Sequence, residues 1–196
     1  MPKLGMEEIR RRQLIEATIA SIHEVGLAES SLSRISARAG VSTGIVHHYF
    51  DGKAELLEST LRQLGTSLRQ AVVARLQRAR TPIERLMAVV DGNIGADQFT
   101  PEGVSAWLAF WAQVPTHPQL ARIQHAIISR LHDNLVDALK LMGQDDDEAH
   151  EIAHVTAALI DGLWLRAALS HQAPDPERAR RLVLDYLHAR LDETLE

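Results

Sequence analysis

Residues 31–53 read SLSRISARAGVSTGIVHHYFDGK, and this stretch decides the fold of the N-terminal part of the chain. Its first half places Leu32, Ile35 and Ala39 on one face of a helix, at the i, i+3 and i+7 spacing of an amphipathic segment. A serine stands directly before this helix, where its side chain can cap the first turn. The glycine that follows Ala39 can adopt the backbone geometry of a sharp turn. Two short helices joined in this way predict a helix-turn-helix over about residues 31–50.

The second helix of this pair exposes small and polar side chains. Val46 and Phe50 lie one helical turn apart and are expected to point inward. Side chains on the opposite face are then free to approach the edges of DNA bases in a major groove. A helical hairpin in an unrelated all-α core would fit the same spacing. The predicted outward face consists of Thr43, Gly44, His47 and His48.

Basic residues flank the motif on both sides. Lys53 follows a turn at residues 51–52 and opens a new helix, where the helix dipole disfavours a cation. A DNA phosphate at this helix N-terminus would resolve the misfit, so Lys53 is predicted to contact the DNA backbone. Upstream, Arg10, Arg11 and Arg12 lie beside the predicted DNA face. Arg10 and Arg11 are predicted DNA contacts, and a solvated basic turn is the alternative for each of them.

Charge divides unevenly along the 196 residues. Residues 1–53 carry seven Lys or Arg against six Asp or Glu, whereas residues 54–196 carry fourteen against twenty. Any DNA-binding face is therefore expected in the N-terminal part. The chain has no cysteine, which excludes disulfides and thiolate metal sites and fits a reducing cytoplasm. We expect no secretory signal and no contact with a membrane, because the N-terminus is charged and the longest uncharged stretch contains prolines.

Apolar residues recur with helical spacing along almost the whole chain, and no alternation with period two is evident. The predicted fold class is therefore all-α. Gly26 is expected to end the first helix, and Thr81 and Pro82 to open another as its cap and first residue. Besides these features and the helix-turn-helix, helices are predicted over about residues 7–25, 53–79, 101–113, 117–142, 146–170 and 176–194.

The last two predicted helices carry broad apolar stripes. Such stripes can be buried within one chain, or they can form a four-helix contact between two copies. A contact between copies is favoured because a single helix-turn-helix reaches few base pairs and a dimer doubles the readout. We therefore predict a homodimer. The two stripes are Ile152, Val155, Leu159 and Leu163 in one helix and Leu182, Val183, Tyr186, Leu187 and Leu191 in the other.

Residues 35–57 resemble the signature of the TetR family of transcriptional repressors. The blocks IRRRQLIEAT, AGVSTG, HYF, AWLAFWA and ALIDGLWLRAAL further resemble the choline-responsive members of that family and are spread over most of the chain. The resemblance implies a three-helix DNA-binding domain in residues 1–53 and a helical ligand-sensing and dimerisation domain in residues 54–196, with neither enzymatic activity nor a cofactor. It places seven residues where the family contacts DNA: Ser31, Thr43, Gly44, His47, His48, Tyr49 and Lys53.

Two positions depart from the pattern of the choline-responsive members. His47 stands where serine is expected, and residues 92–95 read GNIG where GNFD is expected. The departure at His47 concerns which operator sequence the protein binds, and the departure at residues 92–95 concerns which ligand it binds.

Choline carries a trimethylammonium group, which donates no conventional hydrogen bond and is held by aromatic faces and a carboxylate in a desolvated pocket. Trp107, Phe110 and Trp111 share one helix face at i, i+3 and i+4. Trp164 lies one turn beyond Asp161, which brings a ring and a negative charge to the same side of another helix. These five residues form the predicted ligand site. An aromatic stripe at such spacing also fits an ordinary core.

Residues 150–154 read HEIAH and match the H-E-x-x-H motif of zinc peptidases. In an enzyme of that kind, His150 and His154 would bind the metal and Glu151 would act as general base. The context argues against it, because the extended motif needs a histidine at the position of Ile160. A solvated helix face explains the motif without a metal.

The sequence therefore predicts a cytoplasmic, homodimeric repressor that binds double-stranded operator DNA and leaves it when a small molecule, expected to be choline, binds. Two alternatives remain: a TetR-type repressor that senses another hydrophobic or cationic molecule, and a zinc hydrolase that uses His150, Glu151 and His154.

Overall fold

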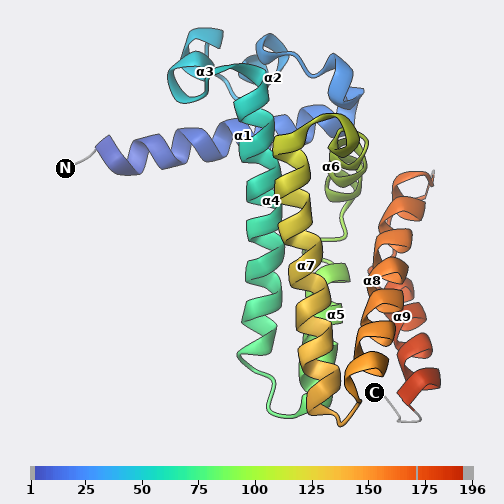
Figure 1. Ribbon diagram of the computed structural model, residues 1–196. Helices are drawn as coiled ribbons and strands as arrows, with labels where there is room; N and C mark the ends of the chain where they lie inside the picture. The colour runs from blue at the N-terminus through green and yellow to red at the C-terminus, as the bar shows by residue number, and fades with distance from the viewer. Residues whose placement is uncertain (1–2, 171, 192–196) are drawn as a thin grey trace.

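A computed structural model describes residues 3–170 and 172–191, and every regular element in these two ranges is helical (Figure 1). The all-α prediction is confirmed. None of these helices is both long and apolar enough to span a bilayer. In chain order the elements are α1 (Lys3–Glu29), α2 (Leu32–Arg38), α3 (Thr43–Tyr49), α4 (Gly52–Leu76), α5 (Pro82–Ile94), α6 (Pro101–Trp111), the 3-10 helix η1 (Val114–Thr116), α7 (Pro118–Leu141), α8 (Asp146–Ala168) and α9 (Pro176–Leu191).

The helix-turn-helix forms as predicted at one end of the molecule (Figure 1). The Ser31 hydroxyl accepts a hydrogen bond of 3.3 Å from the backbone N–H of Arg34 and so caps α2. Gly40 turns the chain with φ 68°, a value that glycine adopts without strain. The small core beneath these helices is made of Leu14, Ile15, Ala17, Ile35, Val46, Phe50 and Leu56.

Helix α1 starts earlier than predicted, at Lys3, and changes direction at the predicted glycine. Gly26 has φ 77° and ψ 165°, so the helical path is interrupted there before a short turn continues to Glu29. The Ser30 hydroxyl donates to the Gly26 carbonyl at 2.8 Å and thereby satisfies one of the groups left open by the break. Ile22, just before the break, belongs to the larger core of the molecule and not to the small one.

Helix α4 connects the two cores along its 25 residues (Figure 1). Leu56 belongs to the small core, whereas Leu61 belongs to the large one, so the division between the cores falls inside α4. Further along, α4 comes very close to α5 at Gly92, where a Cβ atom would lie 2.7 Å from the Cα of Val72. Any larger residue at position 92 would push these two helices apart.

The later helix starts follow local sequence signals. Thr81 and Glu84 form a capping box at the start of α5, with Pro82 in the first turn as predicted. Asp145 caps α8 by accepting a hydrogen bond of 2.9 Å from the Glu148 N–H. For α9, the predicted end at residue 194 lies outside the described residues.

The apolar stripes of α8 and α9 divide between two environments. Ile152, Val183, Leu187 and Leu191 are buried in the core of the same chain, so the prediction that the whole stripes face a second copy is wrong for these four residues. A broad stripe covers more than one helix face, and α8 and α9 pack against α5, α6 and α7 as well as against each other. The side chains left partly or largely open are Val155, Leu159, Leu163, Leu182 and Tyr186.

Candidate DNA interface and ligand cavity

The predicted outward face of α3 is open to solvent over most of its length. Gly44, His47 and His48 are exposed. Thr43 is half-buried, and its hydroxyl lies 3.2 Å from the Ser36 hydroxyl of α2, which fixes the start of α3. Tyr49 is also half-buried and packs edge-on against His48, with 4.9 Å between the ring centroids. Three of these five residues are therefore placed to reach a major groove without rearrangement.

Ile45 is a residue of this face that sequence reasoning missed. Its side chain is 38% exposed on α3, although isoleucine is among the residue types most often buried. Helical spacing could have indicated this exposure, because position 45 does not lie on the helix face that carries Val46 and Phe50. An exposed apolar side chain on a recognition helix can contact the methyl group of thymine.

Arg11, a predicted DNA contact, has several partners inside the molecule. Its guanidinium donates to the main-chain carbonyl of Tyr49, lies 4.3 Å from the centre of the Phe50 ring and pairs with Glu55 at 3.6 Å. It therefore ties α1 to the end of α3 and the start of α4. Arg10 donates a hydrogen bond of 2.9 Å to Gln13 on its own helix.

Lys53 has an acceptor inside the molecule that the sequence did not reveal. Its ammonium group donates to the main-chain carbonyl of Leu27 at 3.2 Å, just beyond the break in α1. The Leu27 carbonyl thus offsets part of the unfavourable interaction between the Lys53 charge and the dipole of α4. An ammonium group has three donors, so a phosphate contact remains compatible with this bond.

A narrow cavity lies among α4, α5, α6, α7 and α8, at the place where the aromatic residues were predicted to meet. It has a volume of only about 30 Å³, enough for one or two water molecules. Four of the five predicted ligand residues line it, whereas Phe110 is fully buried and is not part of the lining. The lining consists of Leu68, Asn93, Trp107, Trp111, Gln124, Ile127, Ile128, Leu131, Ile160, Asp161 and Trp164.

Three indole rings meet around this cavity. The ring centroid of Trp107 lies 6.2 Å from that of Trp111 and 6.2 Å from that of Trp164. The Trp164 indole N–H donates to the main-chain carbonyl of Asn93 at 3.2 Å, and its ring packs nearly perpendicular to that of Phe99, with 4.9 Å between the centroids. Trp164 is therefore held in position from two sides while it lines the cavity.

Three polar groups of this cavity lack partners among the described residues. Burial raises the pKa of Asp161 to about 6, and in the described part of the chain this carboxylate has no ion pair or hydrogen bond. The Gln124 Oε1 and the Trp111 Nε1 are buried and also have no hydrogen-bond partner among those residues. Gln124 was missed by sequence reasoning. An acceptor, a donor and a carboxylate around one small aromatic cavity are complementary to a small polar cation.

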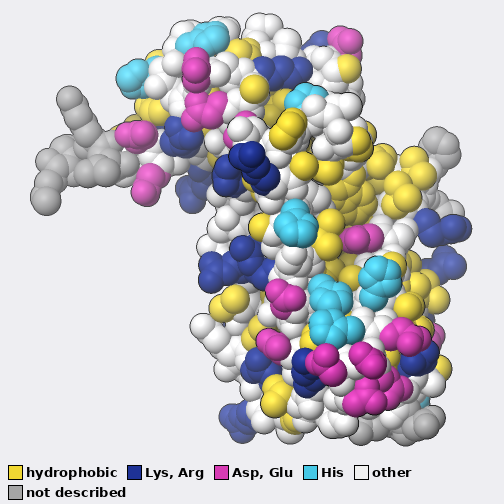
Figure 2. Space-filling model, in the orientation of Figure 1, with side chains coloured by type: hydrophobic (Ala, Val, Ile, Leu, Met, Phe, Trp, Pro, Cys, Tyr) yellow, Lys and Arg dark blue, Asp and Glu magenta, His cyan; other side chains and the backbone are white. Residues whose placement is uncertain are grey.

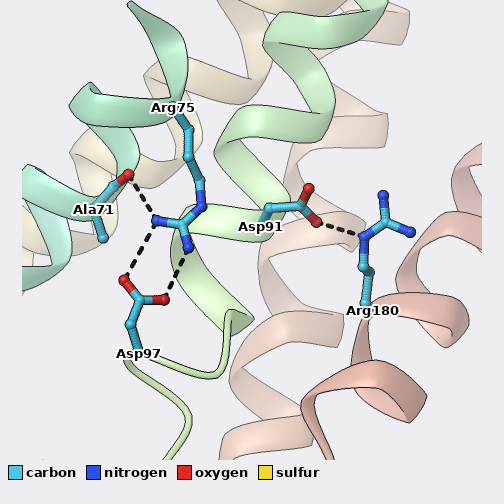
Figure 3. A network of polar contacts seen from close by, with 5 residues as sticks. All are labelled: Ala71, Arg75, Asp91, Asp97 and Arg180. Carbon is cyan, nitrogen blue, oxygen red and sulfur yellow. Dashed lines mark hydrogen bonds and ion pairs between the residues drawn. The ribbon is translucent and has the colours of Figure 1, made fainter. Parts of the chain in front are cut away.

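Two contacts link the cavity helices to the rest of the molecule. His23 of α1 and Ser105 of α6 are hydrogen-bonded at 2.9 Å, so the helix that carries Trp107 touches the DNA-binding end directly. Arg75 of α4 binds Asp97, in the loop that leads into α6 (Figure 3). The ligand cavity is therefore joined to α1 through one end of α6 and to α4 through the loop before it.

The H-E-x-x-H residues do not form a metal centre. His150, Glu151 and His154 are exposed on α8, and Glu151 pairs with Arg190 at 3.5 Å. The ring of His150 packs against that of His132, with 5.2 Å between centroids. Within residues 3–170 and 172–191, no group of three or more possible ligands is placed to hold a metal ion. Figure 2 shows acidic side chains gathered over the start of α8, at the end of the molecule opposite α3 (Figure 1).

Comparisons with protein families agree with this arrangement. Residues 14–60 match the family described as "Bacterial regulatory proteins, tetR family", and residues 82–192 match "BetI-type transcriptional repressor, C-terminal". The first range holds the helix-turn-helix, and the second holds most of the cavity lining. TetR-family regulators are DNA-binding proteins without enzymatic activity, and they act as dimers that bind operator DNA and small molecules. The zinc hydrolase alternative has no support.

Curated relatives match almost the full length of the chain. BetI 1 of Chromohalobacter salexigens is 45% identical over 192 residues, which cover 97% of this chain and 95% of that protein. BetI of Escherichia coli is 46% identical over 189 residues, which cover 95% and 96%. Both are named HTH-type transcriptional regulators.

Solved structures share the fold. A transcriptional regulator from Pseudomonas aeruginosa is 28% identical with a TM-score of 0.76, and covers 94% of this chain and 91% of its own. A regulator from Saccharomonospora viridis, solved in complex with choline, is 22% identical with a TM-score of 0.81, and covers 92% and 96%. With its helix-turn-helix and its identity of about 45% to BetI proteins over nearly the full length, the chain belongs to the TetR family as a BetI-type transcriptional repressor.

Proposed function

We propose that this repressor controls genes for making glycine betaine from choline in the cytoplasm, and that choline bound in the aromatic cavity releases it from its operator. The observation that carries the proposal is Asp161, a half-buried carboxylate that has no ion-pair partner among the described residues, beside the indoles of Trp107, Trp111 and Trp164. The choline bound to the Saccharomonospora viridis regulator, which has the same fold, supports this ligand class.

The cavity offers choline a partner for each of its two ends. The trimethylammonium group would lie against the indole faces, where the ring quadrupoles and Asp161 attract it. The hydroxyl group would donate to the Gln124 Oε1 and accept from the Trp111 N–H, which are the two uncharged groups of the lining without a partner. Binding would therefore satisfy three buried groups at once.

Choline is much larger than the space of about 30 Å³, so the cavity must widen when choline binds. Trp107 is buried on α6, and a shift of its ring moves that helix. The hydrogen bond between His23 and Ser105 passes a shift of α6 to α1, and α1 carries part of the small core beneath α3. We infer that widening of the cavity reorients the recognition helix and spoils the spacing of two half-sites on DNA.

Two copies are needed for two half-sites, and α8 and α9 offer the surface for their contact. Val155 and Leu182 remain 37% and 43% exposed on these two helices, which lie together at one edge of the molecule (Figure 1). Joining two copies there would bury both side chains and leave each α3 at an outer end. We therefore propose an isologous four-helix dimer.

Titration calorimetry with choline, with and without the DNA upstream of the chain's own gene, tests the proposal. Choline should bind, and operator DNA should weaken its binding by the same factor by which choline weakens operator binding, roughly 5- to 150-fold. Trp164→Ala and Asp161→Asn should abolish the response while operator binding without choline persists. Absence of heat at millimolar choline, or equal affinity with and without operator, would contradict the choline assignment and leave the repressor assignment intact.

A further inference from the structure

A second feature of the sensor domain is a groove between α4 and α7 that is lined by arginine. It has a volume of about 560 Å³, and no acidic residue is part of its lining. Such a concentration of positive charge is unexpected in a segment of the chain that carries fourteen basic and twenty acidic residues. The arginines that line the groove are Arg62, Arg69, Arg122 and Arg130.

The four guanidinium groups are free to bind a ligand. All four side chains are exposed, and none has an ion-pair partner among residues 3–170 and 172–191. The only side-chain hydrogen bond that the structure gives them is the 3.3 Å contact of Arg122 with Gln119. Arginine binds phosphate through two parallel hydrogen bonds, and its charge is permanent.

Close packing of α4 and α7 forms part of the groove lining. Gly65 of α4 is buried against the side chain of Ile127 of α7, and a Cβ atom at position 65 would lie 2.7 Å from the Ile127 Cδ1. Two of the four arginines come from α4 and two from α7, so positive charge from both helices lines one groove. Such a lining favours an anionic ligand.

The groove is connected to the aromatic cavity by shared lining residues. Arg69 and Arg130 line a further pocket of about 330 Å³, which shares the lining residues Leu68, Asn93, Ile127 and Leu131 with the cavity. The indole-lined cavity and the arginine-lined spaces thus have wall residues in common. Ile127 belongs to the lining of all three spaces.

We propose that the α4–α7 groove is a phosphate-binding site for a small molecule. The phosphate belongs either to a free phosphate compound or to a ligand whose trimethylammonium end enters the aromatic cavity. The second source rests on the proposed function of that cavity, whereas the phosphate site does not.

Inorganic pyrophosphate and phosphocholine are the probes for this site, titrated by calorimetry into the full-length protein at about 150 mM salt, where weak surface attraction is screened. Arg69→Gln with Arg130→Gln should weaken pyrophosphate binding roughly tenfold or more, because each arginine supplies charge-assisted hydrogen bonds. The matched control is Arg78→Gln with Arg181→Gln, which removes the same charge from exposed positions outside the groove and should leave binding unchanged.

The two probes separate the two sources. If one ligand spans both spaces, phosphocholine binds more tightly than pyrophosphate, and Trp164→Ala weakens it. If the phosphate is free, phosphocholine binds no more tightly than pyrophosphate, and Trp164→Ala has no effect on either. The proposal is overturned if neither probe binds, or if the groove variant binds both as the control does. A choline titration of the groove variant tests the aromatic cavity independently.

Discussion

Arg75 of α4 binds Asp97 through both carboxylate oxygens, at 2.9 and 3.4 Å, and its guanidinium also donates to the Ala71 carbonyl one turn earlier (Figure 3). Burial alone would raise the pKa of Asp97, but the hydrogen bonds and charge of Arg75 lower it below its usual value. Gly95 makes room for the pair, since a Cβ atom there would lie 2.9 Å from the guanidinium. The loop before α6 is therefore held against the helix that leads to the DNA-binding end.

Arg75→Gln should weaken the coupling between choline and operator DNA without unfolding the protein. A partly exposed ion pair contributes only about 0–1 kcal/mol to stability, so the fold should persist. Choline should still bind, but the ratio of its affinities with and without operator should move towards one. The control is Arg180→Gln, which breaks the 2.7 Å pair with Asp91 between α5 and α9 and should keep the ratio (Figure 3). Equal ratios in both variants would exclude the Arg75 route.

Asp161→Asn should stabilise the choline-free protein at neutral pH. Burial raises the pKa of Asp161 to about 6 from an ordinary value of 3.8, so ionisation costs the folded state stability as pH rises through this window. The variant should gain up to roughly 3 kcal/mol in free energy of unfolding above pH 6, and the gain should vanish below about pH 4. Denaturant unfolding at several pH values measures this.

Asp97→Asn is a control for which the expected change in stability has the opposite sign. The pKa of Asp97 is lowered in the folded protein, so its carboxylate stabilises the fold at neutral pH and ceases to do so as the pH falls through that lowered pKa. This variant should lose stability at neutral pH and match the parent in acid. A stability gain from Asp161→Asn that persisted unchanged in acid would show that burial of charge is not its cause.

Lys53→Ala should weaken binding to operator and to non-specific DNA alike. If the ammonium group contacts a phosphate, the slope of log affinity against log salt should fall by about one. Loss of the bond to Leu27 could disturb α1, so Lys53→Arg is the companion variant, because it keeps the charge. An unchanged salt slope in a folded Lys53→Ala protein would leave Lys53 with a structural role only.

His47→Ala should relax base preference and leave non-specific affinity nearly unchanged. The side chain is exposed on α3 and has no contact that supports the fold, so its loss removes base-edge contacts alone. Operators with single-base changes should be discriminated less at one position, where a specific contact is worth about 1–3 kcal/mol. His125→Ala, exposed on α7 and outside the helix-turn-helix, is the comparison for simple loss of a surface histidine.

The features that the sequence predicted correctly depend on local chemistry. Ser31, Thr81 and Pro82 act on backbone groups a few residues away, and Gly26 and Gly40 adopt positive φ for reasons contained in one residue. Helical periodicity likewise identified Val46 and Phe50 as buried, because inward residues repeat with the helix itself.

The features that the sequence did not reveal depend on neighbours far along the chain. Arg11 contacts a carbonyl 38 residues away, and Lys53 contacts one 26 residues away, so neither charge could be recognised as internally engaged. Phe110 shares a helix with Trp107 and Trp111, yet α6 has more than one buried face and places this ring in the core. Gln124 has no periodic or charge signal that marks it as a cavity residue.

A test of the dimer surface must use the exposed residues of α8 and α9, because part of each apolar stripe is buried within its own chain. Leu187 is fully buried in its own chain, so a charge there would unfold the protein instead of separating two copies. Val155→Glu with Leu182→Glu places two carboxylates on the open side of α8 and α9. If this surface joins two copies, the variant should sediment as a folded monomer and bind the operator far more weakly, because half-sites are then contacted singly.

A matched control distinguishes this effect from a general cost of surface charge. Val73 is 37% exposed on α4, as Val155 is on α8, and Leu141 is 58% exposed at the end of α7. Val73→Glu with Leu141→Glu adds the same charge to apolar positions away from α8 and α9, so it should remain dimeric. A folded Val155→Glu, Leu182→Glu protein that still sedimented as a dimer would move the contact to another face, since two unpaired carboxylates cannot be buried there without a large loss of affinity.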